Sequence, residues 1–336
     1  MRAIDVHAHV IVPELLRGTG AGASESWRPA VRRRDGRHVI EHEGRTITSA
    51  VDEFVELDAI LAAQERRGID GVLLCPWVAL LFAEAPAAQA LERCRLQNDA
   101  LAALRSRSPE RVSVLGAVPL QDPELGASEL ERLMARGEFC GVEVPASLGG
   151  RYLGDRTFEP FWAAAQATRA LVFVHPTTRG FRAPVFEEHY LWNLVGNPFE
   201  TTIAAAQLVL SGTLERHPQA RILLAHAGGA IGTLRGRLAH GHRAVAAAGD
   251  QAAESPRAAI GRFLFDTVTH DAELLRALIE LVGADRVLLG SDYPFDMADP
   301  DPVGTVRAAG LSARAERAVL YGNAARELRA AAGVAG

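Results

Sequence analysis

The sequence predicts an α/β protein with the (β/α)8 TIM barrel fold, and two observations support this prediction. Short apolar or β-branched runs recur eight times along the 336 residues, and stretches with helical spacing, rich in Ala, Leu, Arg and Glu, separate most of them. Strands that alternate with helices form parallel βαβ units. Eight such units match a closed barrel, whose usual size is about 250 residues. Because 48% of the residues are hydrophobic, the chain can fill a large core, and we expect one domain over residues 1–336.

The expected strands are short, and after them the spacing of apolar residues changes to that of a helix. Helical spacing is clearest at residues 56–65, before Gly68, and at residues 272–281, before Gly283. Glycine just beyond a periodic stretch is typical of a helix end. The eight strands are expected at residues 4–9, 71–75, 112–118, 141–144, 171–175, 222–226, 263–268 and 287–291.

Two segments exceed what a minimal barrel needs. Residues 18–49 are Gly- and Arg-rich and form an insertion after strand 1, and residues 177–198 form a lid-like segment after strand 5. Both lie on loops that leave the carboxyl ends of strands, where a barrel keeps its active site. We therefore expect both segments to cap the site, the alternative being surface excursions without a function.

Composition excludes several classes of protein. The net charge of −5 gives no reason to expect a nucleic-acid partner. The longest apolar run, residues 71–82, is too short to span a bilayer and contains Pro76. The first strand begins within a few residues of Met1, so no signal peptide is expected. Three cysteines cannot all pair, which favours a reducing cytoplasm.

The chain contains no lysine, and all 36 basic residues are arginine. A lysine Schiff base is therefore impossible, which closes that route to carbon–carbon cleavage. A carbamylated lysine that bridges two metal ions is equally impossible. Any metal site is therefore expected to hold a single ion.

The motif Asp5-Val6-His7-Ala8-His9 lies on the first expected strand. Side chains two residues apart share a face of a strand, so His7 and His9 point the same way. Two imidazoles on one face suit a divalent metal such as zinc, and a nearby carboxylate can orient a ligand or bind the ion itself. On the motif alone, a pair of surface histidines on an edge strand is an equal alternative.

Three more polar residues stand at strand ends. His175 ends strand 5, His226 ends strand 6 and Asp292 follows strand 8. Singly, each histidine could be a satisfied core residue, and Asp292 could form a turn. Together with His7 and His9 they would be costly if buried without a role. We assign His7, His9, His175 and Asp292 as ligands of one divalent ion, and His226 as the acid/base that exchanges a proton beside it.

These motifs resemble the amidohydrolase superfamily. Longer strings narrow the resemblance to the branch of aminocarboxymuconate-semialdehyde decarboxylase. They are Asn-Leu-Val-Gly-Asn-Pro-Phe-Glu-Thr-Thr at 193–202, His-Ala-Gly-Gly at 226–229, Asp-Thr-Val-Thr-His at 266–270 and Gly-Ser-Asp-Tyr-Pro-Phe at 290–295. The likeness covers nearly the whole chain and weakens over residues 18–49.

The resemblance implies a metal-dependent, non-oxidative decarboxylase acting on an unsaturated or aromatic carboxylic acid. It implies one zinc ion, with manganese as the alternative, on the same four ligands, and catalytic roles for His226 and Asp292. It also implies arginines that bind the substrate carboxylate, which are assigned here to Arg237 and Arg45, with Arg37 next. In the relatives the first arginine reaches the neighbouring subunit's site, so a homodimer is implied.

Alternatives to this interpretation remain at the sequence level. A mononuclear hydrolase of a lactone, ester or amide would use the same ligands, and a metal-binding scaffold without catalysis would not need His226. Glu143 on strand 4 could bridge a second metal, and His270 could bond near the site. Asp5 is expected behind the ligands. Trp77 and Trp192 could line a ring-binding site or simply pack in the core or lid.

Overall fold

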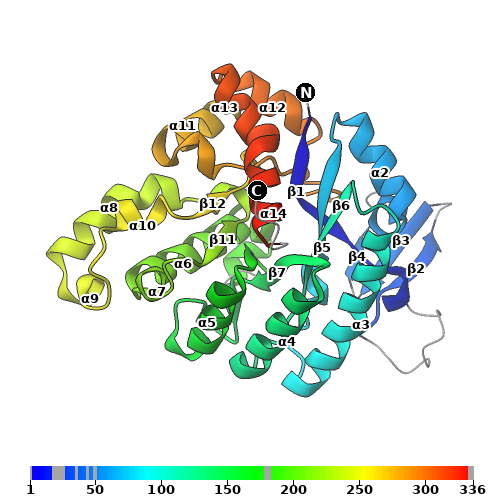
Figure 1. Cartoon of the computed structure of the whole chain (residues 1–336), viewed down its shortest axis with the longest axis horizontal. Coiled ribbons are helices and arrows are strands. Elements are labelled where there is room, and N and C mark those ends of the chain that lie inside the picture. Colours follow the sequence, from blue (N-terminus) through cyan, green and yellow to red (C-terminus); the bar gives the residue numbers. More distant parts are fainter. Residues whose placement is uncertain are drawn as a thin grey trace.

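A curled parallel sheet forms the centre of the molecule (Figure 1). The computed structural model describes residues 2–16, 27–34, 37–42, 45–47, 51–177 and 183–331. Within these residues the sheet has the order β1-β5-β6-β7-β10-β11-β12, and neighbouring strands are parallel. The predicted α/β class and succession of parallel strands are confirmed. The strands are β1 (Ile4–Val10), β5 (Gly71–Pro76), β6 (Val112–Gly116), β7 (Phe139–Pro145), β10 (Leu171–His175), β11 (Arg221–Leu224) and β12 (Leu264–Phe265).

The predicted eighth strand, residues 287–291, is not a regular strand. The segment forms an isolated parallel bridge between Val287 and Phe265 of β12. Tyr293, just beyond the segment, forms another with Ala8 of β1. The Leu289 amide donates to the Val319 carbonyl at 3.0 Å, and the Gly290 amide donates to a threonine hydroxyl at 3.1 Å. Because these amides bond outside a ladder, a continuous strand does not form. The segment nevertheless lies between the two edge strands of the sheet.

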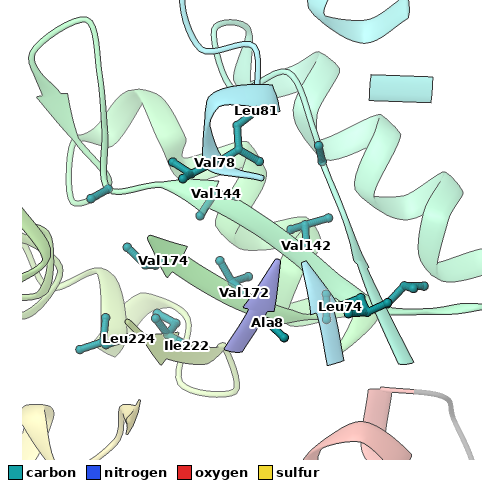
Figure 2. Packing of buried hydrophobic residues seen from close by; sticks show 14 of the residues in the cluster. Ala8, Leu74, Val78, Leu81, Val142, Val144, Val172, Val174, Ile222 and Leu224 are labelled. Carbon is teal, nitrogen blue, oxygen red and sulfur yellow. The ribbon is translucent and has the colours of Figure 1, made fainter. Parts of the chain in front are cut away.

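The strands bury alternate residues on opposite faces of the sheet. On β5, Val72 and Leu74 join a large cluster beneath the helices, part of which is shown in Figure 2. Leu73 and Cys75 join a second cluster inside the curl. Helix α14 (Asn323–Ala331) contacts β1, β7 and β10 and adds Ala324 to that inner cluster. The near-continuous apolar strands predicted from the sequence follow from burial on both faces.

The helices lie outside the sheet and follow most of its strands (Figure 1). The two helices predicted from spacing are confirmed as α2 and α11. Helix α11 begins where the Asp271 side chain accepts hydrogen bonds from two backbone amides, and it ends at Gly283, whose φ of 96° suits glycine. The longer helices are α2 (Leu57–Arg66), α3 (Ala87–Ser106), α4 (Pro123–Arg136), α5 (Glu159–Thr168), α6 (Asn197–Leu210), α8 (Ile231–Ala244), α11 (Ala272–Val282) and α14 (Asn323–Ala331). The shorter ones are α1 (Val51–Val55), α7 (Thr213–Arg216), α9 (Ala246–Gly249), α10 (Pro256–Ile260), α12 (Pro302–Ala308) and α13 (Ala313–Arg317).

The described part of the insertion after β1 forms a small antiparallel sheet. Its strands are β2 (Ala30–Arg34), β3 (Arg37–His42) and β4 (Arg45–Ile47), a structure that the sequence did not indicate. The ring of His42 contacts that of Trp77 edge to face, with centroids 5.1 Å apart. Since Trp77 directly follows β5, the small sheet lies near the carboxyl end of the central strands. Residues 27–29, which precede β2, are also described, and the other residues of this insertion lie outside the described part.

In the segment after β10, residues 178–182 lie outside the described part. The segment contains a short turn at Pro184–Phe186 and a π-helical turn at Trp192–Gly196 that leads into α6. Its predicted role as a lid stays a prediction. Among the helices described, none has both the length and the apolar composition needed to cross a bilayer.

Candidate metal centre

The structure brings together the four side chains that the sequence assigned as metal ligands. His7 and His9 project from β1, His175 is the last residue of β10, and Asp292 follows the irregular segment 287–291. His7 Nε2 lies 3.1 Å from His9 Nε2 and 3.2 Å from Asp292 Oδ1, and His9 Nε2 lies 3.3 Å from the same oxygen. One donor atom from each of the four residues lies within 4.8 Å of the others, and all four residues are buried.

Hydrogen bonds at the back of each imidazole ring fix its orientation. His9 Nδ1 donates to the Pro76 carbonyl at 3.0 Å, and His175 Nδ1 donates to the Pro176 carbonyl at 2.7 Å. His7 Nδ1 donates to Asp266 Oδ2 at 2.7 Å. Since a carbonyl or carboxylate oxygen only accepts, the proton of each neutral ring is on Nδ1. Each Nε2 therefore presents a lone pair to the centre, as a metal ligand must.

The atoms at the centre fit a cation. With the ring protons on Nδ1, the Nε2 atoms of the histidines and Asp292 Oδ1 are all acceptors that face one another. Asp292 Oδ1 and His175 Nε2 are buried and lack a hydrogen-bond partner in the structure described. Buried polar atoms without partners are unfavourable, and a divalent ion would satisfy them together. Three imidazole nitrogens and one carboxylate oxygen suit zinc and also manganese.

Electrostatics at the centre also favour a cation. Burial opposes charge on His7, but the carboxylates of Asp292 and Asp266 raise its pKa to about 10. Burial likewise opposes charge on Asp292, but cationic His7 and hydrogen bonds from histidines hold its pKa well below the usual range. Burial, with the neighbouring histidines, lowers the pKa of His175 well below the usual value. An ionised Asp292 and a neutral His175 are the forms that bind a metal. The two carboxylates that raise the pKa of His7 would stabilise the charge of a bound ion in the same way.

His226 lies beside these four residues, in a turn that directly follows β11. Its Nε2 is 3.5 Å from Asp292 Oδ2, and its side chain is 14% exposed, whereas those of His7 and His9 are fully buried. Its φ of 54° and that of Ala227, also 54°, are uncommon for residues other than glycine. A strained, partly accessible imidazole next to buried acceptors is placed to exchange a proton with a bound molecule.

Of the predicted substrate arginines, only Arg237 has a described side chain. Arg237 is exposed on α8. Arg45 begins β4, where it pairs with His42, but its side chain lies outside the described part of the structure, as does that of Arg37. The roles of these arginines therefore stay predictions.

Asp5, Glu143 and His270 are the residues to which the sequence gave secondary roles near the site, and their surroundings differ. Asp5 accepts a hydrogen bond from the His7 backbone amide at 3.0 Å and one from the Ser291 hydroxyl at 2.5 Å, so it holds β1 to the segment before Asp292. Glu143 Oε1 is 4.0 Å from His9 Nδ1, and burial raises the pKa of Glu143 well above its usual range. It is not among the four residues of the group. His270 is exposed.

Two tryptophans and one further aspartate lie near the elements that carry the group. Trp77 is buried against Phe54 and His42, as expected of core packing. Trp192 is half-buried, with its ring against Tyr190 at a centroid distance of 4.7 Å. Asp266 received no role from the sequence, although it binds both His7 and the turn at His226. An acidic residue inside an expected strand, within one of the strings that carried the resemblance, was the available signal.

Comparison with known proteins identifies the family. The amidohydrolase family model matches residues 4–330, so the chain belongs to that family. The resemblance drawn from the sequence is thereby confirmed.

Several named relatives and solved structures are decarboxylases. The chain is 28% identical over 306 residues to 2-amino-3-carboxymuconate-6-semialdehyde decarboxylase from Dictyostelium discoideum, covering 89% of this chain and 83% of that one. The structure of 5-carboxyvanillate decarboxylase from Sphingomonas paucimobilis matches with a TM-score of 0.81 at 23% identity, over 98% of this chain and 99% of the other. Dihydroxybenzoic acid decarboxylase from Polaromonas sp., with bound manganese and 2-nitroresorcinol, matches with a TM-score of 0.79 at 22% identity, over 97% and 96%. The relatives bear out the predicted carboxy-lyase class over the hydrolase alternative.

Proposed function

We propose that this protein catalyses the metal-dependent, non-oxidative decarboxylation of an aromatic or unsaturated carboxylic acid. The observation that carries the proposal is the buried convergence of His7, His9, His175 and Asp292, with His226 beside them. The decarboxylases among its relatives support the reaction class. A scaffold without catalysis would gain nothing from a partly exposed histidine in a strained turn.

One divalent ion is the proposed cofactor, held by the same four residues that also formed the sequence prediction. Zinc is proposed, because three imidazole nitrogens and one carboxylate match its usual ligands. Manganese is the alternative, and the Polaromonas decarboxylase structure contains it. When bound, the ion orients the substrate oxygens and stabilises the negative charge that develops.

The proposed reaction requires one proton and no oxidant. Protonated His226 donates its Nε2 proton to the substrate carbon that carries the carboxylate. The bond from that carbon to the carboxylate then breaks, CO₂ leaves, and the electron pair of the broken bond returns to the conjugated system. Asp292 Oδ2, 3.5 Å from His226 Nε2, orients the imidazolium. His226 regains its proton from solvent, to which its side chain is 14% exposed.

The finer features of the fold belong to the same proposal. The bridges of Val287 and Tyr293 to the two edge strands support a closed eight-stranded TIM barrel. We propose that residues 18–49 and 177–198 cap its active end, since both follow strands that carry proposed ligands. The match of one family model to residues 4–330 supports a single domain.

We further propose that the chain is a homodimer in which Arg237 serves the neighbouring subunit's site. Its exposed position on α8 supports a reach outside its own chain. Co-expression of Arg237→Ala with His226→Asn distinguishes the two arrangements. If Arg237 acts across the interface, mixed dimers contain one intact site, and about a quarter of wild-type activity returns. If it acts within its own chain, no activity returns.

The experiment that tests the function measures metal content and CO₂ together. Purified protein is submitted to elemental analysis and then assayed for CO₂ release from muconate-semialdehyde and hydroxybenzoate-type acids. One ion per chain with CO₂ release is the expected result. One ion without CO₂ from any acid, but with turnover of lactones or esters, would replace the decarboxylase by the hydrolase. Absence of a metal from active protein would refute both.

A further inference from the structure

We infer that Asp266 is a positioning residue that ties the proposed ligand His7 to the turn bearing the proposed proton donor His226. The inference rests on the proposed function of that site. Asp266 directly follows β12 and is fully buried. It touches neither the centre of the group nor solvent, so its effect on chemistry would pass through the residues that it holds.

Both carboxylate oxygens of Asp266 are fully used. Oδ2 accepts from His7 Nδ1 at 2.7 Å and from the His226 backbone amide at 2.9 Å. Oδ1 accepts from the backbone amides of Ala227 at 2.6 Å and Val268 at 3.0 Å. One rigid group thus joins three elements, β1, the turn after β11 and the chain after β12. A change in the position of this carboxylate would move a ligand ring and the acid/base turn together.

The contacts require a group that only accepts hydrogen bonds. An asparagine at 266 would replace one of the two carboxylate oxygens by an NH₂ group. That NH₂ group would then face two N–H donors. The backbone amides of Ala227 and Val268 cannot reverse their polarity, whereas the His7 ring can change tautomer. With its proton on Nε2, His7 would have no lone pair directed to the centre. Asparagine is therefore expected to weaken metal binding through His7.

The same carboxylate supports the turn at His226. His226 and Ala227 both have φ of 54°, and the backbone amide of each donates to Asp266. Residues other than glycine adopt this conformation where the surroundings enforce it. The two hydrogen bonds supply that constraint, so loss of Asp266 should also change where the His226 imidazole lies.

Gly290 makes the close approach of His7 and Asp266 possible. A Cβ at Gly290 would lie 2.8 Å from the Cβ of Asp266 and 2.9 Å from the Cβ of His7, closer than real Cβ contacts allow. Gly290→Ala should therefore push these residues apart without altering the carboxylate. It is a second, independent way to disturb the same contact.

The experiment compares Asp266→Asn with Asp271→Asn in the full-length protein. Asp271 is exposed and also accepts hydrogen bonds from two backbone amides, at the start of α11, so it matches the substitution without touching the site. Zinc affinity of the apoprotein is measured by competition with a chromogenic chelator. Asp266→Asn is expected to raise the Kd by about 10–100-fold, the usual effect of losing the partner of a ligating histidine. Asp271→Asn should leave the Kd unchanged.

A second readout follows the His7 ring itself. Nitrogen chemical shifts of ¹⁵N-histidine-labelled apoprotein show whether Nδ1 carries a proton, in a neutral ring and in an imidazolium alike, and His7→Gln assigns the signal. Wild type and Asp271→Asn should show Nδ1–H at His7, and Asp266→Asn should lose it. If Asp266→Asn does not fold, Gly290→Ala takes its place in the affinity measurement.

The outcomes separate this inference from the proposed function. Unchanged zinc affinity and an unchanged His7 tautomer in a folded Asp266→Asn or Gly290→Ala variant would overturn the inference. Failure of the wild-type protein to bind zinc or manganese would instead overturn the proposed metal site.

Discussion

Replacing His226 by asparagine is expected to lower the rate of CO₂ release by about 10²–10⁴-fold, the usual contribution of a positioned acid/base. The metal content should stay at one ion per chain, because His226 is not among the four residues that converge on the centre. Asparagine tolerates the left-handed backbone at this position, so the turn with φ of 54° should persist. The measurement is kcat for the identified acid, with metal analysis of the same sample.

His270→Asn is the matched control for this substitution. His270 has nearly the same φ, 55°, and follows the next strand of the sheet, but its side chain is exposed. The kcat of the His270→Asn variant should equal that of the wild type. A His226→Asn variant that keeps wild-type turnover would exclude His226 as the proton donor, whatever metal it contains.

The parallel strands could be predicted because burial on both faces gives each strand an apolar run of its own. The period of two within a run also predicted correctly that His7 and His9 point the same way. The segment 287–291 has an equally apolar sequence, but its amides at Leu289 and Gly290 bond outside a ladder. An apolar pattern predicts that a segment is buried, but it does not predict which acceptor each backbone amide will bond.

The small sheet β2-β3-β4 shows another limit of sequence reasoning. Its strands contain several arginines and no clear alternation of apolar and polar residues. The sequence therefore predicted an irregular insertion there. Antiparallel pairing satisfies their backbone groups, and one contact, His42 on Trp77, helps to place the small sheet against the central strands. Such a contact joins residues distant in sequence and leaves no local signal.

The candidate site was more predictable than its supports. Parallel strands bring their carboxyl ends to one edge, so polar residues such as His175 and His226 at strand ends are expected to meet. Asp266 stands at a strand end too, yet its role depends on two contacts, one to a ring on β1 and one to a strained turn. No periodicity distinguishes a carboxylate that binds an ion from one that holds a ligand in place.

Removal of the metal is expected to abolish CO₂ release and to destabilise the fold. Chelation would leave acceptors of His7, His9 and Asp292 facing one another in a buried space, with His175 Nε2 unpartnered. Metal at 100 times its Kd should raise the free energy of unfolding by about 2.7 kcal/mol over the apoprotein. Activity and denaturant unfolding are measured on stripped protein before and after one equivalent of Zn²⁺ or Mn²⁺ is added.

The choice of ion and a matched pair of variants complete this test. Mg²⁺ should restore neither property, because it prefers oxygen ligands and three of the four donors are imidazoles. His175→Ala should lose the ion and the activity together, whereas His240→Ala, on the exposed surface of α8, should keep both. Full turnover by rigorously stripped protein would contradict the metal-dependent mechanism. Retention of one ion per chain by His175→Ala at wild-type affinity would instead remove His175 from the ligand set and require a fourth donor from elsewhere. Glu143, a buried carboxylate 4.0 Å from His9 Nδ1, is a candidate for that donor.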